Sequence, residues 1–187
     1  DFTRAACAME LGLHVPGHSQ PVPKYDKEPA KNRQFDLNEE ECLALTAYMA
    51  ALPAPVQRIP RIKHDRNLML QGEARFAAIG CADCHRAKLG DVVGIYSDLL
   101  LHDMGDALAD GRPDFKANGR QWKTPPLWGI GLIRDVNGHT RLLHDGRANG
   151  VLEAVLWHGG EAQQSREKVL KFSAADRAAL VKFVESL

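Results

Sequence analysis

The sequence of 187 residues lacks the net charge and the long apolar segments that define several large classes of protein. It has 24 basic and 24 acidic residues, and this balance gives no electrostatic case for binding nucleic acid or an anionic membrane surface. Since no apolar run approaches the length of a bilayer-spanning helix, we expect no membrane span. Strand signals are also few, so we expect a mainly α fold, with room for one ordinary domain and an extension.

Cysteine is scarce as well, but two of the four cysteines lie in the string C-A-D-C-H at residues 81–85. The pattern C-x-x-C-H is the attachment motif of a c-type haem. Cys81 and Cys84 would each add a sulfur to a haem vinyl group, and His85 would bind one face of the iron. On the first turn of a helix, this spacing lets all three side chains face one edge of a flat ring. The motif therefore predicts one covalent haem c and a redox function.

Two other kinds of site contain C-x-x-C and must be weighed against haem. A four-ligand zinc site would need a second pair of ligands, and the sequence has no second C-x-x-C. A thioredoxin-like dithiol would need a preceding strand, whereas residues 72–80 read as an amphipathic helix with Phe76 and Ile79 on one side. Haem is therefore the preferred interpretation. The remaining Cys7 and Cys42 form either a disulfide, as an oxidising compartment favours, or two buried free thiols.

The distribution of proline and glycine divides the chain into two regions. We expect residues 1–62 to be a helical and loop extension, the end of a truncated upstream region. It has a helix over 3–12, an aperiodic loop over 14–35 and a capped helix from Asp36 that Pro53 ends. We expect residues 63–187 to be the haem domain.

Within 63–187, helical periodicity appears at both ends and is weak in the middle. Residues 68–80 predict a helix that leads into the haem motif, and residues 88–146 are rich in glycine and proline. Further helices are predicted over 150–158, 161–172 and 173–187, the last with a cap-like start at Ser173. We expect this final helix to pack against the helix before the motif.

Four further strings, taken with C-A-D-C-H, resemble the C-terminal haem domain of the di-haem oxidoreductases, also called thiol oxidoreductases. This family is related to the bacterial di-haem cytochrome c peroxidases. The strings are Y-S-D-L-L-L-H-D-M-G (96–105), W-K-T-P-P-L-W-G (122–129), L-H-D-G-R-A (143–148) and L-W-H-G-G-E-A (156–162). The resemblance implies a class I cytochrome c-like haem domain with long irregular loops. Residues 1–60 match more weakly.

The resemblance also implies partners and a location. The partners would be an upstream haem domain of the same protein, a redox partner protein and a small oxidant such as peroxide. Because haem c is normally assembled outside the cytoplasmic membrane, we expect a periplasmic or otherwise exported bacterial protein. The sequence begins Asp1-Phe2-Thr3-Arg4 without a signal peptide, so we expect a longer precursor.

The ligand on the second face of the iron stays open. The peroxidases carry a methionine where this chain has Leu143, and leucine cannot bind iron. Met104 would give His/Met ligation and a high potential, whereas His158 or His144 would give His/His ligation and a lower one. An iron without a second protein ligand would admit peroxide.

Three residues match a peroxidase loop that lines the haem edge, and the resemblance implies that they contact the cofactor: Thr124, Pro125 and Trp128. The preferred function is electron transfer within a di-haem oxidoreductase of the bacterial peroxidase type. The alternative is a haem with an open distal site that itself reduces peroxide or oxidises a substrate. A third hypothesis is an interaction domain whose C-x-x-C-H binds nothing.

Overall fold

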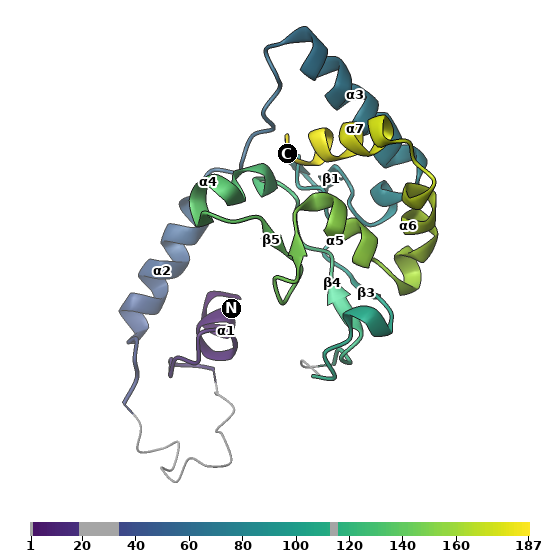
Figure 1. Cartoon of the computed structure of the whole chain (residues 1–187). Coiled ribbons are helices and arrows are strands. Elements are labelled where there is room, and N and C mark those ends of the chain that lie inside the picture. The colour runs from purple at the N-terminus through teal and green to yellow at the C-terminus, as the bar shows by residue number, and fades with distance from the viewer. Residues whose placement is uncertain (1, 19–33, 113–115) are drawn as a thin grey trace. The chain divides into compact units, whose positions relative to one another are not determined.

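The computed structural model describes residues 2–18, 34–112 and 116–187 (Figure 1). Most of the loop expected over 14–35 therefore lies outside the described residues, as does a short piece of the irregular segment 88–146. The chain divides into two compact units, residues 1–53 and 54–187. The described fold is mainly α, as the scarcity of strand signals predicts.

The described part of the first unit contains the helices α1 (Phe2–Met9) and α2 (Glu39–Ala51). The helix α2 begins at a capping box, in which the Asn38 side chain accepts from the Glu41 N–H and the Glu41 carboxylate accepts from the Asn38 N–H. Its buried core is small: Cys7, Ala8, Val15 and Cys42. Both cysteines are buried in this core as free thiols, and a disulfide between them stays a prediction for the oxidised protein.

The second unit holds the C-x-x-C-H motif. Its α-helices are α3 (Lys63–Ala78), α4 (Ile133–Asn137), α5 (Val151–Trp157), α6 (Gln163–Leu170) and α7 (Ala174–Val184). Its 3₁₀ turns are η2 (Cys81–Asp83), η3 (Asp106–Leu108), η4 (Ile130–Leu132) and η5 (Gly160–Ala162). The helix α7 starts at Ser173, whose hydroxyl accepts from the Asp176 N–H.

Helices α3 and α7 cross at close range (Figure 1), which confirms the predicted pairing of the last helix with the helix before the motif. Gly72 of α3 lies against the backbone of Ala179 and the side chain of Phe183. A methyl group on Gly72 would come within 2.6 Å of the Ala179 carbonyl carbon and 2.7 Å of the Phe183 Cβ. The crossing therefore requires glycine on α3.

An aromatic cluster continues the core from this crossing to the motif. The rings of Phe76 and Phe183 have centroids 5.3 Å apart, and Tyr96 lies 6.1 Å from Phe76 and 5.7 Å from Phe183. The ring of His85 lies 6.3 Å from Phe76. The core that joins the two long helices of this unit thus extends to the motif histidine.

Short antiparallel pairs interrupt the irregular middle of the unit. The described strands are β1 (Lys88–Leu89), β2 (Val92–Val93), β3 (Leu101–Asp103), β4 (Gln121–Lys123), β5 (Arg141–Leu142) and β6 (Ala148–Asn149). They pair as β1–β2, β3–β4 and β5–β6, and His102 lies opposite Trp122. Segments of two or three residues are too short to show a period in the sequence.

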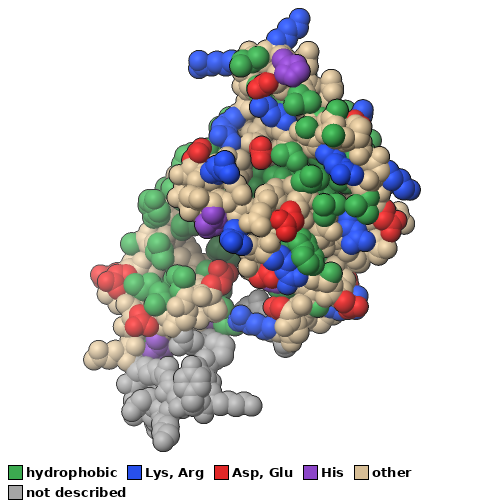
Figure 2. Space-filling model, in the orientation of Figure 1, with side chains coloured by type: hydrophobic (Ala, Val, Ile, Leu, Met, Phe, Trp, Pro, Cys, Tyr) green, Lys and Arg blue, Asp and Glu red, His purple; other side chains and the backbone are tan. Residues whose placement is uncertain are grey.

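Two further observations concern the distribution of charge on the surface and the length of the helices. On the face shown in Figure 2, basic and acidic side chains are interspersed and do not gather by sign. Within the described residues, no helix has the length and apolar character needed to cross a membrane.

Candidate haem-binding site

The motif follows α3 directly and turns tightly. Gly80 has a φ of 96°, a left-handed conformation that lets the chain leave the helix at once. The 3₁₀ turn η2 follows, and the His85 N–H donates to the Cys81 carbonyl at 2.9 Å. Cys81, Cys84 and His85 are all half-buried. The backbone thus brings both thiols and the imidazole onto one turn.

The imidazole of His85 is in the form that binds metals. Its Nδ1 lies 3.0 Å from the Tyr96 carbonyl oxygen, and because a carbonyl only accepts, Nδ1 carries the proton. Burial, aided by the nearby His158, lowers the pKa of His85 to about 4, although the hydrogen bond with Tyr96 acts to raise it. The ring is therefore neutral at physiological pH, and its lone pair lies on Nε2. A backbone carbonyl on the other nitrogen is the usual way to orient a ligating histidine.

The two thiols are not activated nucleophiles. Burial, aided by the charge of Asp83, raises the pKa of Cys81 to about 11. Burial and then the charge of Asp98 raise the pKa of Cys84. Reactive dithiols and zinc ligands need thiolates, which form where the thiol pKa is lowered. This environment therefore does not favour a thioredoxin-like dithiol.

A zinc site fits the neighbouring residues no better. Among the described residues, one group of three metal-ligand types comes together, with ligand atoms of Cys84, Asp98 and His102 within 4.8 Å of one another. Both ring nitrogens of His102 already face carboxylate oxygens, so this histidine offers no lone pair. Cys81, the other half of the C-x-x-C, is not in the group.

A buried segment over residues 95–98 supports the motif from the side. The Ser97 N–H donates to the Arg86 carbonyl at 2.9 Å, and the Ser97 hydroxyl donates to the Thr124 carbonyl at 2.7 Å. Tyr96, which holds His85, has a φ of 50°, an uncommon conformation for a residue with a side chain. The segment is thus fixed at several points at the place where it meets His85.

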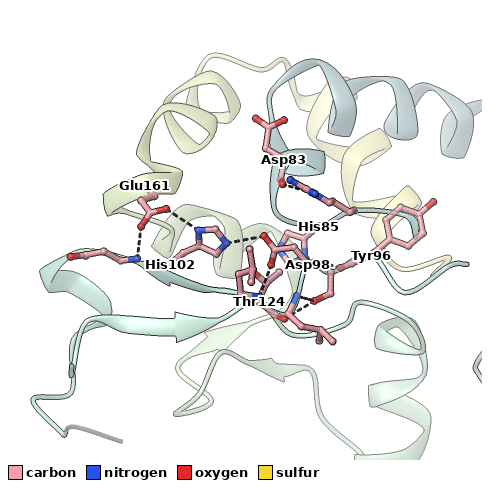
Figure 3. A network of polar contacts seen from close by, with 12 residues as sticks. Asp83, His85, Tyr96, Asp98, His102, Thr124 and Glu161 are labelled. Carbon is pink, nitrogen blue, oxygen red and sulfur yellow. Dashed lines mark hydrogen bonds and ion pairs between the residues drawn. The ribbon is translucent and has the colours of Figure 1, made fainter. Parts of the chain in front are cut away.

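A network of charged side chains starts from the same segment (Figure 3). The His102 Nε2 lies 2.9 Å from an oxygen of the buried Asp98, and its Nδ1 lies 2.8 Å from an oxygen of Glu161. The bonds from Glu161 and Asp98 raise the pKa of His102 despite partial burial. Burial acts to raise the pKa of Asp98, but hydrogen bonds from the Leu100 N–H, His102 and the Thr124 hydroxyl outweigh this effect and lower the pKa. The network is therefore an imidazolium between two carboxylates.

Two of the three candidates for the second axial ligand meet at one backbone junction. His158 is the C-cap residue that follows α5, its Nδ1 donates to the Ala154 carbonyl at 2.7 Å, and burial lowers its pKa. A methyl group on the next residue, Gly159, would lie 2.9 Å from the Met104 carbonyl oxygen. Met104 and His158 are therefore neighbours, although 54 positions separate them in the sequence.

The third candidate lies in a different environment. The ring of His144 stacks on Trp122, with centroids 3.7 Å apart and planes tilted by 14°. The Trp122 indole N–H donates to the Leu108 carbonyl at 3.0 Å. Leu143, which stands where the peroxidases have methionine, adopts a φ of 71°.

The loop residues expected at the haem edge are placed unequally. Thr124 is buried, and its hydroxyl donates to Asp98. Pro125 is exposed and Trp128 is half-buried in the turn before η4.

Residues 39–187 match the protein family described as "Di-haem oxidoreductase, putative peroxidase". The chain belongs to this family. The match covers the C-x-x-C-H motif, the segment 95–98 that supports His85, and the three candidates for the second axial ligand. Among curated proteins, none matches the chain.

A solved structure shares the fold of the family domain. The chain is similar to hydrazine synthase from Kuenenia stuttgartiensis, solved under xenon pressure, with a TM-score of 0.57 and 17% sequence identity. The match covers 80% of this chain and 55% of that one, so the chain spans about half the length of the solved relative. At this identity the likeness shows the fold alone.

The donor set of this family member fits a haem. It offers two protonated thiols on one turn and a neutral histidine whose Nδ1 is held by a backbone carbonyl. The sequence-based interpretation missed Asp98, His102 and Glu161. Each stands inside one of the strings that carry the family resemblance, so the strings themselves were the available signal.

Proposed function

We propose that this chain is a class I cytochrome c-like domain that carries one covalent haem c and transfers electrons within a di-haem oxidoreductase of the bacterial peroxidase type. The observation that carries the proposal is the state of His85: neutral, with Nδ1 bound to the Tyr96 carbonyl and Nε2 left with its lone pair. The close crossing of α3 and α7 over long irregular connections supports the fold assignment.

Cys81 and Cys84 hold the haem through thioether bonds, and His85 binds its iron. When bound, the haem supplies a one-electron redox centre whose potential depends on its axial ligands and surroundings. Burial of the three side chains between α3 and the segment 95–98 limits the access of water to them. The hydrogen bonds of the segment 95–98 would hold the His85 ring in one orientation toward the iron, which favours electron transfer.

His158 takes the sixth coordination position in this proposal. Its ring has the same preparation as that of His85, with Nδ1 on a backbone carbonyl and burial favouring the neutral form. The charge of His158 acts to lower the pKa of His85, so the two imidazoles lie within electrostatic range of each other. Met104 on the adjacent backbone is the alternative, and His144 is held against Trp122 instead.

A protein ligand on each face leaves no iron position for peroxide, so the domain acts as a carrier. The family name specifies two haems, whereas these 187 residues contain a single C-x-x-C-H. The electron partner is then a haem domain elsewhere in the same protein. In this proposal an external redox protein donates the electrons and a small oxidant finally accepts them. Because covalent haem attachment normally takes place outside the cytoplasmic membrane, an exported, periplasmic location is part of this proposal.

The test is periplasmic production with haem c maturation proteins, followed by haem quantitation per chain and spectroscopy of the ferric state. We expect one haem per chain that survives denaturation, and a low-spin spectrum of His/His type. Cys81→Ser and Cys84→Ser should each reduce the covalent haem. A chain that returns without haem would overturn the proposal, and it would leave the interaction-domain hypothesis.

Two variants identify the sixth ligand. His158→Ala should convert the spectrum to high-spin, whereas Met104→Leu should leave it unchanged. If Met104→Leu abolishes a near-infrared methionine–iron band instead, the ligand is Met104. A high-spin wild type that turns over peroxide would favour the catalytic alternative.

A further inference from the structure

His102 lies between two carboxylates that belong to different parts of the fold (Figure 3). Asp98 is on the buried segment 95–98, and Glu161 is in η5, directly after α5. The two contacts, 2.9 Å to Asp98 and 2.8 Å to Glu161, use both ring nitrogens. One imidazole therefore ties the strand β3 to two other segments at once.

The contact with Asp98 connects His102 to the proximal side of the candidate site. Asp98 lies two residues after Tyr96, whose carbonyl accepts from His85. Tyr96 has a φ of 50°, and Leu99, which directly follows Asp98, has a φ of 58°. Such strained residues persist only where the surroundings fix them, so the Tyr96 carbonyl and the Asp98 carboxylate are held in place together.

The contact with Glu161 connects His102 to the two ligand candidates. Glu161 also accepts from the Asp103 N–H at 2.8 Å, next to Met104. The backbones then approach so closely that a methyl group on Gly159 would meet the Met104 carbonyl at 2.9 Å. The junction that holds Met104 beside His158 is therefore closed by the same carboxylate that binds His102.

We propose that His102 is a positioning residue: by bridging Asp98 and Glu161 it sets the place of the Met104–His158 junction relative to His85, and it thereby selects the sixth ligand of the iron. This inference rests on the proposed function. It assigns to the network a role in ligand selection and not only in stability.

The chemistry of the bridge explains why histidine is needed at this position. A protonated imidazole offers two N–H groups in fixed opposite directions, so it can bind two carboxylates at once. Glutamine at 102 has one NH₂ group, and its amide oxygen would face the second carboxylate. His102→Gln would therefore keep one arm of the bridge and lose the other.

The test measures haem content, ferric electron paramagnetic resonance and reduction potential of His102→Gln in the periplasmically matured protein. We expect the wild-type covalent haem content, because the motif is intact. We also expect loss of most of the native low-spin signal, replaced by a high-spin or differently ligated species, and a changed potential. A wild type without haem would reject the proposed function, whereas unchanged spectra and potential in a haem-loaded variant would reject this inference alone.

A second variant covers the case in which His102→Gln fails to fold. The Glu161 side chain is 56% exposed, so Glu161→Leu breaks the other arm without opening a cavity. It should produce the same change of ligation, whereas Glu167→Leu, which replaces an exposed acid on α6, should not. Lower thermal stability of Glu161→Leu with native ligation would show a purely structural bridge and overturn the proposal.

Discussion

Replacing Gly72 by alanine tests the crossing of α3 and α7 through the sign of its effect. In an isolated helix, Gly→Ala stabilises by up to about 1 kcal/mol. In this protein the new methyl group would lie 2.6 Å from the Ala179 carbonyl carbon and 2.7 Å from the Phe183 Cβ, whereas ordinary contact begins at 3.4 Å. Because the new methyl group would clash with the backbone of Ala179, a change of side-chain conformation cannot relieve the clash, and the whole of α7 must move. Overpacking of this kind costs about 1–3 kcal/mol or somewhat more.

Since the clash is with backbone atoms, the cost lies at the upper end of this range, about 3 kcal/mol, and subtracting about 1 kcal/mol of helix propensity leaves a net loss of about 2 kcal/mol of unfolding free energy. For a chain of this size that loss lowers Tm by roughly 4–8 °C. The assay is thermal and urea unfolding followed by haem absorbance, which reports on the unit that carries the motif. Gln71→Ala, at the exposed neighbouring position of α3, is the control and should change stability by less than about 0.5 kcal/mol. A Gly72→Ala protein as stable as the wild type, or more stable, would refute the close crossing.

Three further predictions concern a helix cap, a titration and a cross-link. Ser173→Ala removes the acceptor for the Asp176 N–H and should cost about 1 kcal/mol in urea unfolding, whereas Ser173→Thr should restore most of it. In haem-free protein, nitrogen NMR should find the His85 ring neutral with its proton on Nδ1. The pKa of His85 is about 4 in the folded protein and 6.5 in the unfolded chain, so between these pH values unfolding takes up a proton. The unfolding free energy should therefore rise with pH across this window. Titration of His85 near pH 6.5 would contradict its burial. After oxidation with a disulfide reagent, peptide mapping without reduction should recover Cys7 joined to Cys42, and fully alkylatable thiols in the oxidised protein would exclude the bridge.

Local chemistry made part of this fold predictable from the sequence. The capped starts at Asn38 and Ser173, and the helices that follow them, depend on residues only three positions apart. The pairing of α3 with α7 followed from two apolar helical patterns at the two ends of the haem region, and Gly72 shows how close it is. The motif itself depends on five consecutive residues.

The support around the motif could not be predicted in the same way. Asp98, His102 and Glu161 come from an irregular segment, a three-residue strand and a three-residue 3₁₀ turn. In such short elements polar side chains are common, and no period marks a buried one. Their meaning depends on contacts that span 59 residues between His102 and Glu161. Likewise, only the folded chain shows that His158 and Met104 share a junction, whereas His144 lies on Trp122.

The crossing of α3 and α7 also has a consequence for the order of events during folding. The two helices are the first and the last long helices of their unit. Until α7 packs on α3, Phe76 and Tyr96 lack the Phe183 ring that lies against them. The core that reaches the motif therefore stays open until this late pairing is made. If haem is attached outside the cytoplasmic membrane, as proposed, an exported chain that has not yet closed the crossing would expose Cys81 and Cys84 to maturation enzymes.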